Sequence, residues 1–169
     1  MNGLVLNITR FIVLLFVQVL LLNQIEIGFG IQLMVYPLFI FLLPMKMNRI
    51  ALLFLAFMFG IFIDAFSNTY GLHTSAILLF AFLKPMIFNL FYNQDDFDPS
   101  IEMNVLNMGT VWFIKVFGTL LFVHHFWFFF IEMFQFNKIG FVFQKTLLSL
   151  PLSFLISILL QYLFVKKHK

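Results

Sequence analysis

The chain has 169 residues, of which 63% are hydrophobic and only 10% are charged. A soluble domain is roughly 45–50% apolar and about 25% charged, so the composition excludes a soluble fold and indicates a single transmembrane domain over residues 1–169. The formal net charge of +3 rests largely on the C-terminal residues KKHK, which are typical of a membrane-surface anchor, and nothing else suggests nucleic-acid binding. No cysteine occurs, so disulfide and thiolate chemistry are excluded.

The apolar segments are continuous runs, which predict an all-α integral membrane protein and lack the alternation of a membrane β-barrel. A spanning helix needs about 20 apolar residues. The first segment has one early charge and no small-residue cleavage site behind it, so we expect an uncleaved helix. Six candidate transmembrane helices cover approximately residues 4–23, 32–44, 50–66, 71–92, 109–134 and 143–165.

The second segment, QLMVYPLFIFLLP, is short for a spanning helix and contains Pro37 and Pro44. A tilted helix, a broken helix and a partly re-entrant segment are all open on the sequence. Broken membrane helices need surrounding protein to satisfy the freed backbone groups. Other parts of the chain must therefore supply those partners if the helix is broken.

The charges predict the topology. With six helices and a cytoplasmic N-terminus, all Lys and Arg residues except Lys138 and Lys145 lie on the inner side. This asymmetry favours two cytoplasmic termini, and an odd helix count would break the pattern. The longest polar loop, residues 93–107, is then also inside. In it, Asp98 followed by Pro99 predicts a helix start, because a capping carboxylate precedes a proline at the first helical position.

Small and polar residues recur every four positions in three predicted helices. Residues four apart lie on one helix face, and small residues there let membrane helices approach closely and bond across the contact. We expect helix packing or a partner surface, with a polar cavity wall as the alternative for the last helix. A Ser→Ala change is expected to be mild, whereas Ser153→Phe or Gly60→Leu is expected to be severe. The stripes are Ser149, Ser153, Ser157 and Gln161, extended outward by Lys145; Ala56, Gly60 and Asp64; and Gly71 and Ser75.

Asp64 stands within the stretch GIFIDAFSNTYGLHTSAIL. An ionisable residue at membrane depth is costly and is a functional candidate by default. The predicted topology puts Asp64 at the outer end of the third helix, near the interface. It could cap the turn 67–71, accept amide hydrogens there, pair with His73, or contact a partner protein.

The sequence offers little for catalysis. His124 and His125 are adjacent and point to different helix faces, whereas a helical metal site needs ligands three or four apart. His125 and Glu132 are separated by two turns, and His73 near Asp64 lacks a third ligand. The eight glycines are scattered and form no phosphate-binding loop. We therefore expect no enzyme, no metal and no cofactor. An intramembrane enzyme is left as a weaker alternative, because the Ser, His and acidic residues of a catalytic triad come together in space and not in sequence.

Residues 60–83, GIFIDAFSNTYGLHTSAILLFAFL, resemble the rod shape-determining protein MreD family. That family's pattern is a glycine, an acidic residue four positions on, a short polar turn, and Gly-Leu followed by a polar residue and a long apolar helix. These positions are Gly60, Asp64, Gly71, Leu72 and His73. The chain length, the uncleaved first helix, the proline-broken second segment and the basic tail also resemble the family.

The resemblance implies a non-enzymatic scaffold or regulator in the bacterial inner membrane. Such proteins belong to the elongasome, the machinery that elongates the cell wall, regulates peptidoglycan synthesis and maintains rod shape. The implied direct partner is the bitopic protein MreC, with membrane lipid around it. The implied indirect partners are MreB, RodA and a class B penicillin-binding transpeptidase, and a homo-oligomer is left open. Asp64 would then have a structural role.

The family also looks like the substrate-binding subunits of energy-coupling-factor vitamin transporters, which have six helices in a similar layout. This alternative implies small-molecule binding. Such subunits typically carry an alanine-x-x-x-alanine pattern in the first helix, whereas FIVLLFVQVLLLN contains no alanine, which counts against transport. Candidate pocket residues on the outer side of the predicted topology are Asp64, Asn68, His73, Lys138 and Lys145.

Overall fold

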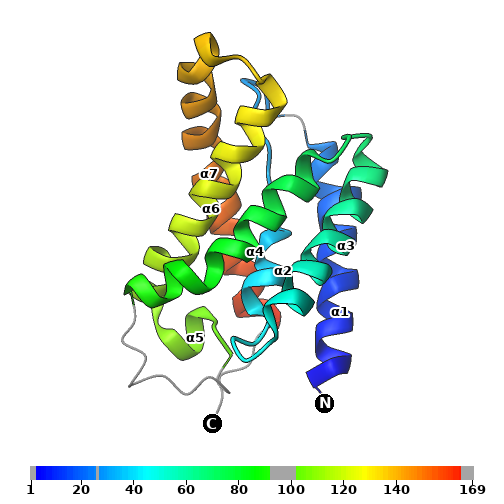
Figure 1. Ribbon diagram of the computed structural model, residues 1–169, viewed down its shortest axis with the longest axis vertical. Helices are drawn as coiled ribbons and strands as arrows, with labels where there is room; N and C mark the ends of the chain where they lie inside the picture. The colour runs from blue at the N-terminus through cyan, green and yellow to red at the C-terminus, as the bar shows by residue number, and fades with distance from the viewer. Residues whose placement is uncertain (1–2, 26, 92–101, 165–169) are drawn as a thin grey trace.

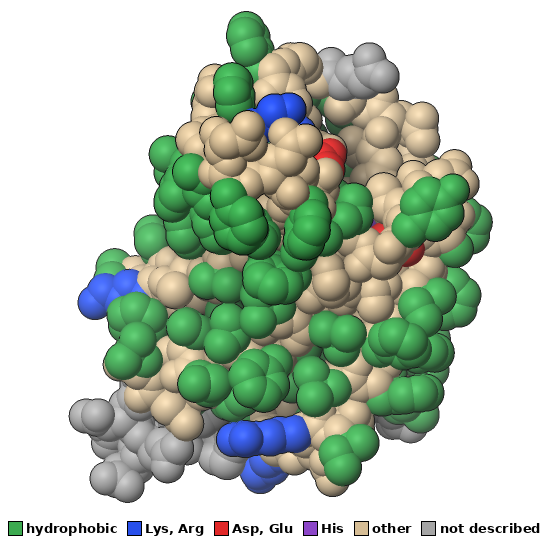
Figure 2. Space-filling model, turned by 45° about the horizontal axis from the view of Figure 1, so that its top comes forward, with side chains coloured by type: hydrophobic (Ala, Val, Ile, Leu, Met, Phe, Trp, Pro, Cys, Tyr) green, Lys and Arg blue, Asp and Glu red, His purple; other side chains and the backbone are tan. Residues whose placement is uncertain are grey.

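The computed structural model describes residues 3–25, 27–91 and 102–164, which form helices and turns without a β-strand. Hydrophobic side chains cover most of the face seen in Figure 2, and Lys and Arg lie toward its edges. The chain is therefore an all-α, multi-pass membrane protein. Five helices in this part of the chain are long and apolar enough to cross a membrane: Gly3–Gln24, Arg49–Ser67, Leu72–Phe91, Thr110–Met133 and Phe136–Tyr162.

Four of these helices have nearly the predicted bounds. The first comprises α1 (Gly3–Phe16), a π-helical turn (Val17–Leu21) and a 3₁₀ turn (Leu22–Gln24). The next three are α3 (Arg49–Ser67), α4 (Leu72–Phe91) and α6 (Thr110–Met133). Asn48 caps α3 by accepting a hydrogen bond from the amide of Ile50 at 2.8 Å.

The last long helix, α7 (Ile139–Phe164), follows a 3₁₀ turn (Phe136–Lys138) and begins before residue 143, the predicted start. A four-residue helix, α5 (Val105–Met108), precedes α6 and is separated from it by Gly109, whose φ of 85° interrupts the helix. The predicted helix start at Asp98 and Pro99 lies outside the described residues.

The predicted spanning helix over residues 32–44 is not formed. Residues 31–35 are non-helical, and only α2 (Pro37–Leu42), six residues long, is helical. The two prolines explain this difference. Pro37 lacks an N–H, so it is tolerated only in the first turn of a helix. Pro44 disfavours a helical conformation at the residue before it, so the helix ends ahead of Pro44. This segment still carries the chain between the two ends of the bundle, so that α1 begins and α7 ends at the same end (Figure 1).

The bundle is built from successive antiparallel contacts of α3 with α4, α4 with α6, and α6 with α7. The helices α3 and α4 approach each other closely at Gly60. A Cβ atom there would stand 2.5 Å from Thr74 Cα and 2.9 Å from Ile77 Cγ2, so no side chain fits without displacing α4. Ala56, one turn earlier on the same face, is also fully buried.

Candidate functional site

Serine hydroxyls of α7 bind the backbone of the non-helical segment. The amide of Gln32 donates to Ser149 Oγ, and the amide of Met34 donates to Ser153 Oγ, both at 3.0 Å. Two residues of extended chain advance about 6.6 Å and four residues of helix advance about 6.0 Å. Alternate amides of the segment therefore meet successive serines of the stripe.

The opposite edge of the segment is bound by Gln18, which lies fully buried in the π-helical turn after α1. Its Oε1 accepts the amide of Val35 at 2.9 Å, and its Nε2 donates to the carbonyl of Leu33 at 2.7 Å. The side-chain amide thus takes the place of a neighbouring peptide group. Single π-turns of this kind occur frequently at functional sites.

The carbonyl end of α2 is bound by Lys84 of α4. The Lys84 ammonium, 1% exposed, donates to the carbonyls of Ile40 at 2.9 Å and Leu43 at 2.6 Å. The last carbonyls of a helix have no partner within the helix, and a cation there also interacts favourably with the helix dipole. The sequence analysis used Lys84 only as one of the positive charges on the inner side. In the structure Lys84 binds two backbone carbonyls and so has a structural role.

Three buried side chains form a hydrogen-bonded chain through the bundle. Tyr36 OH lies 3.1 Å from His73 Nδ1 on α4 and 2.7 Å from His124 Nε2 on α6. Tyr36 and His124 are fully buried, and His73 is 4% exposed. His124 Nδ1 has no hydrogen-bond partner in the described part of the chain. These two hydrogen bonds connect α4 to α6 through Tyr36, which follows the non-helical segment.

His125 binds other partners than His124, although the centres of the two rings lie 5.4 Å apart. Its Nδ1 lies 2.9 Å from the carbonyl of Leu121, so Nδ1 carries the proton and donates. Its Nε2 lies 3.1 Å from Ser153 Oγ, which also accepts the Met34 amide. Ser153 is thus fixed from both sides.

Asp64 caps α4 from the end of α3. One carboxylate oxygen accepts the Thr69 hydroxyl at 2.7 Å and the His73 amide at 3.0 Å. The other accepts the Thr74 amide at 2.9 Å and the Thr74 hydroxyl at 2.5 Å. Gly71, at φ 89°, supplies the left-handed residue that the intervening turn requires. Asp64 therefore binds the His73 backbone, whereas the His73 ring binds Tyr36.

The other residues of the predicted stripes also bind within the chain. Ser157 Oγ donates to the carbonyl of Ser153 at 2.7 Å, and Gln161 Oε1 accepts the Val105 amide at 2.9 Å. Ser75 Oγ donates to the carbonyl of Leu72 at 2.9 Å. All four members of the α7 stripe are at most 1% exposed, so this stripe faces the interior of the bundle.

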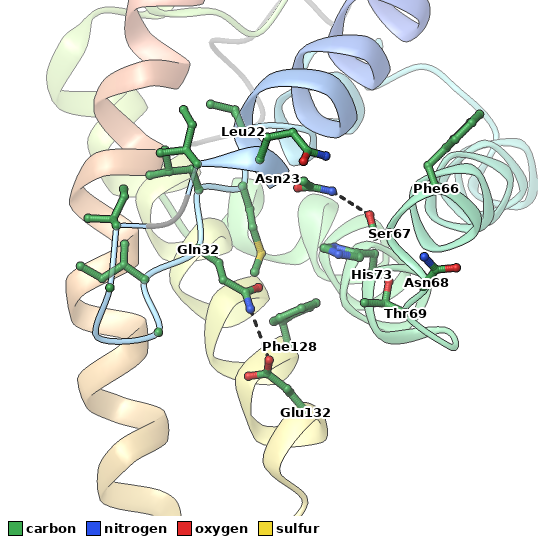
Figure 3. A pocket seen from close by; sticks show the side chains of 18 residues that line it. Leu22, Asn23, Gln32, Phe66, Ser67, Asn68, Thr69, His73, Phe128 and Glu132 are labelled. Atoms are coloured by element: carbon green, nitrogen blue, oxygen red, sulfur yellow. Dashed lines mark hydrogen bonds between the residues drawn. The ribbon is translucent and has the colours of Figure 1, made fainter.

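A cavity of about 590 Å³ opens at the end of the bundle that carries the α3–α4 turn (Figure 3). Its walls are the end of the first helix, the chain before α2, the α3–α4 turn, and one face each of α4 and α6. Figure 3 shows the side chains of His73, Phe128 and Gln32 around the same space. The polar lining residues are Asn23, Gln24, Gln32, Ser67, Asn68, Thr69, His73 and Glu132.

Glu132, a charged side chain on the cavity wall, forms a salt bridge with Lys145. Lys145 Nζ lies 2.8 Å from one carboxylate oxygen of Glu132, and Gln32 Nε2 donates to the other at 3.3 Å. Lys145 Nζ also lies 5.2 Å from the centre of the Phe129 ring. The salt bridge joins α6 to α7 beside the cavity.

Of the five predicted pocket residues, Asn68 and His73 line this cavity. Asp64 instead borders a smaller hollow of about 340 Å³ on the same turn, with both carboxylate oxygens already bound. Lys145 forms a salt bridge with Glu132 and is not itself one of the lining residues. Lys138 lies in the α6–α7 connection. Sequence reasoning missed Asn23 and Gln32, because no spacing rule connects them to residues on α4 and α6.

Within residues 3–25, 27–91 and 102–164, no group of three or more His, Cys, Asp or Glu side chains is placed to hold a metal ion. No family model, no curated protein and no solved structure matches this chain.

Proposed function

We propose that this chain is a non-enzymatic scaffold of the bacterial cell-wall elongation machinery, located in the inner membrane with both termini in the cytoplasm. In this proposal it binds a bitopic, MreC-like protein and is connected through it to MreB, RodA and a class B transpeptidase. The motif Gly60, Asp64, Gly71, Leu72 and His73 supports the proposal through its resemblance to the MreD family.

The observation that supports the proposal is the use of polar side chains within the helix bundle. Gln18, Lys84, Ser149 and Ser153 bind backbone groups of residues 32–43, and Asp64 binds the first amides of α4. Side chains that bind backbone groups in this way hold the fold together, because backbone polar groups in a membrane need partners within the protein. Such a structural use of the polar side chains supports a scaffold.

A partner helix would have to pack on an outward face, because the α7 stripe is buried. Ile8, Ile12 and Phe16 recur every four residues on α1 and are exposed. Leu152, Leu155 and Leu159 form a similar exposed face on α7. A partner helix on either face would be held by van der Waals packing, because these side chains have no hydrogen-bonding groups.

The test is capture of the detergent-solubilised protein from its native membrane, with a photo-crosslinking amino acid placed singly at Ile12 or Leu155. Matched control positions are Phe54 on α3 and Phe82 on α4, which are also exposed. The proposal expects cross-links to a bitopic coiled-coil protein from one face and co-purified wall-elongation enzymes. Recovery of a coupling protein with two ATPases, or no bitopic partner from any position, contradicts it.

A second candidate function is the substrate-binding subunit of a small-molecule transporter. The observation that favours it is the cavity, because ligand sites are typically concave spaces of about 300–1,000 Å³ with a few convergent polar groups. His73, Asn23 and Gln32 supply such groups. Co-purification of a stoichiometric small molecule tests this candidate independently of any bitopic partner.

A further inference from the structure

Three connections at one end of the bundle carry exposed aromatic side chains. The chain before α2, the α3–α4 turn and the α6–α7 connection lie together at this end (Figure 1). Tyr70 is fully exposed, Phe29 is 86% exposed, Phe136 79% and Phe134 74%. These four residues are called the end aromatics below. Such exposure leaves most of each ring without a contact in the described part of the chain.

Two of the end aromatics occupy strained backbone. Phe29 has a φ of 52° and Phe134 a φ of 42°, in the left-handed region that bulky residues rarely adopt. At Phe134 this conformation ends α6, a position that glycine usually fills. Glycine would remove both the strain and the exposed ring at each position. The fold alone does not explain phenylalanine here, whereas a contact outside the chain does.

The backbone around the end aromatics keeps them out of the hydrocarbon layer of the bilayer. Phe29, Tyr70 and Phe134 lie in non-helical backbone. Lipid-exposed backbone of this kind does not occur in the hydrocarbon layer, because its N–H and C=O groups find no partner there. The exposed neighbours Asn68 and Lys138 would also be costly to transfer into hydrocarbon.

Helix lengths place the same connections at the boundary of that layer. The 19 residues of α3 and the 20 residues of α4 are about 29 and 30 Å long, and the hydrocarbon layer is about 30 Å thick. Tyr70 lies between these two helices, so it stands just beyond the layer when they span it. The 24 residues of α6 are about 36 Å long. A helix longer than the layer tilts, and α6 is inclined to α1 in Figure 1, so a tilt keeps Phe134, directly after α6, near the same boundary.

The distribution of the end aromatics fits a lipid surface better than a partner helix. A partner helix packs on residues three or four apart along one helix face. The end aromatics come from three separate connections and share one end of the bundle, not one helix face. The headgroup region accepts aromatic and apolar side chains on its inner side while it leaves neighbouring polar groups hydrated.

We propose that Phe29, Tyr70, Phe134 and Phe136 insert into the lipid headgroup region and anchor the end of the bundle at which the cavity opens. Burial of the rings between headgroups offsets the backbone strain at Phe29 and Phe134. This inference goes beyond the scaffold and the transporter proposals and depends on neither. Partner capture and ligand co-purification do not measure depth in the bilayer, so each proposal can fail alone.

The first experiment measures the depth of single spin labels. The chain contains no cysteine, so nitroxide labels are attached to Phe29→Cys, Tyr70→Cys and Phe134→Cys in vesicles of phosphatidylcholine and phosphatidylglycerol. Electron paramagnetic resonance records collisions of each label with oxygen, which concentrates in hydrocarbon, and with a water-soluble nickel chelate. The control is Phe82→Cys, at an exposed position midway along α4.

Each end label is expected to show an oxygen-to-nickel collision ratio between that of Phe82→Cys and that of the free label in water. A ratio equal to the free label's places the residue in bulk water and overturns the proposal. A ratio equal to that of Phe82→Cys places it in hydrocarbon and also overturns it. Exclusion of both reagents shows a protein cover, such as a second copy of this chain, and overturns it as well.

A measurement on the unmodified protein covers the case in which a labelled variant does not fold. Two phosphatidylcholine probes carry a photoactivatable diazirine, one in the headgroup and one at the end of an acyl chain. After illumination of the vesicles, peptide mass spectrometry locates the labelled residues. The headgroup probe is expected to label the three connections, and the acyl-chain probe the exposed residues Phe54 and Phe82. Connections that the headgroup probe leaves unlabelled contradict the proposal.

Discussion

The amide of Met34 donates a hydrogen bond of 3.0 Å to the hydroxyl of Ser153, 119 residues later in the chain. The same hydroxyl lies 3.1 Å from His125 Nε2. One serine of α7 therefore fixes both the non-helical segment and a histidine of α6. This contact explains how a stretch without helical hydrogen bonds is accommodated among membrane helices, where each backbone group needs a protein partner.

Ser153→Ala is expected to lower the free energy of unfolding by about 1–3 kcal/mol, because it leaves the buried Met34 amide unsatisfied. This effect is larger than the mild effect that the sequence alone suggests. Ser157→Ala is the control, since Ser157 Oγ binds only a carbonyl of its own helix. Denaturant titration of the purified protein in detergent compares the two. Equal stability of both variants contradicts the role assigned to Ser153.

Gly60→Ala is expected to destabilise the protein by about 1–3 kcal/mol through overpacking against Thr74, and Gly60→Leu by more. Gly118 of α6 is the control, because a Cβ there would meet only Phe154 Cε2 at 3.8 Å. Gly118→Ala is expected to be neutral or to stabilise by up to about 1 kcal/mol through helix propensity. Thermal unfolding in one detergent measures both. A Gly60→Leu protein as stable as the wild type would show that α3 and α4 do not pack as described.

Asp64→Ala is expected to cost about 2 kcal/mol or more, because it removes the α4 cap and leaves buried amides without an acceptor. Asp64→Asn keeps one side-chain oxygen and is expected to cost less. Asn48→Ala removes the exposed cap of α3 and serves as the reference for an ordinary cap. Hydrogen exchange at the amides of His73 and Thr74 reports the cap directly, and unchanged protection in Asp64→Ala contradicts it.

Lys84→Met is expected to destabilise the protein by about 1–3 kcal/mol, because the carbonyls of Ile40 and Leu43 remain buried after their donor is gone. A hydrophobic replacement does not compensate, since backbone acceptors cannot be removed with it. Lys115→Met, at an exposed position of α6, is expected to have little effect. Size-exclusion chromatography after heating measures the fraction of each variant that remains folded. This fraction is expected to be lower for Lys84→Met than for Lys115→Met.

Tyr36→Phe is expected to remove the partners of His73 Nδ1 and His124 Nε2 while keeping the ring volume. Histidine-selective ¹⁵N NMR should then show shifted signals for His73 and His124. The signals of His125 should stay in place, because its partners are Leu121 and Ser153. Unchanged His73 and His124 signals would argue against the hydrogen-bonded chain.

Composition and hydropathy alone predict a membrane protein and its long helices. Continuous apolar runs of sufficient length predicted α1, α3, α4, α6 and α7, because a span is set by local hydrophobicity and length. The four-residue spacing of Ser149 and Ser153 also predicted that they share a face. Asp64 was placed correctly at the end of α3, since the polar turn after it is a local signal.

What these faces contact depends on how the helices pack and cannot be predicted from spacing. The helix expected over residues 32–44 is replaced by a non-helical segment, which is stable because Gln18, Lys84, Ser149 and Ser153 bind its backbone from other helices. The cavity likewise depends on side chains that come together from separate helices. Hydrogen bonds between residues far apart in sequence follow no periodicity, so a single sequence predicts the helices but not the partners that complete them.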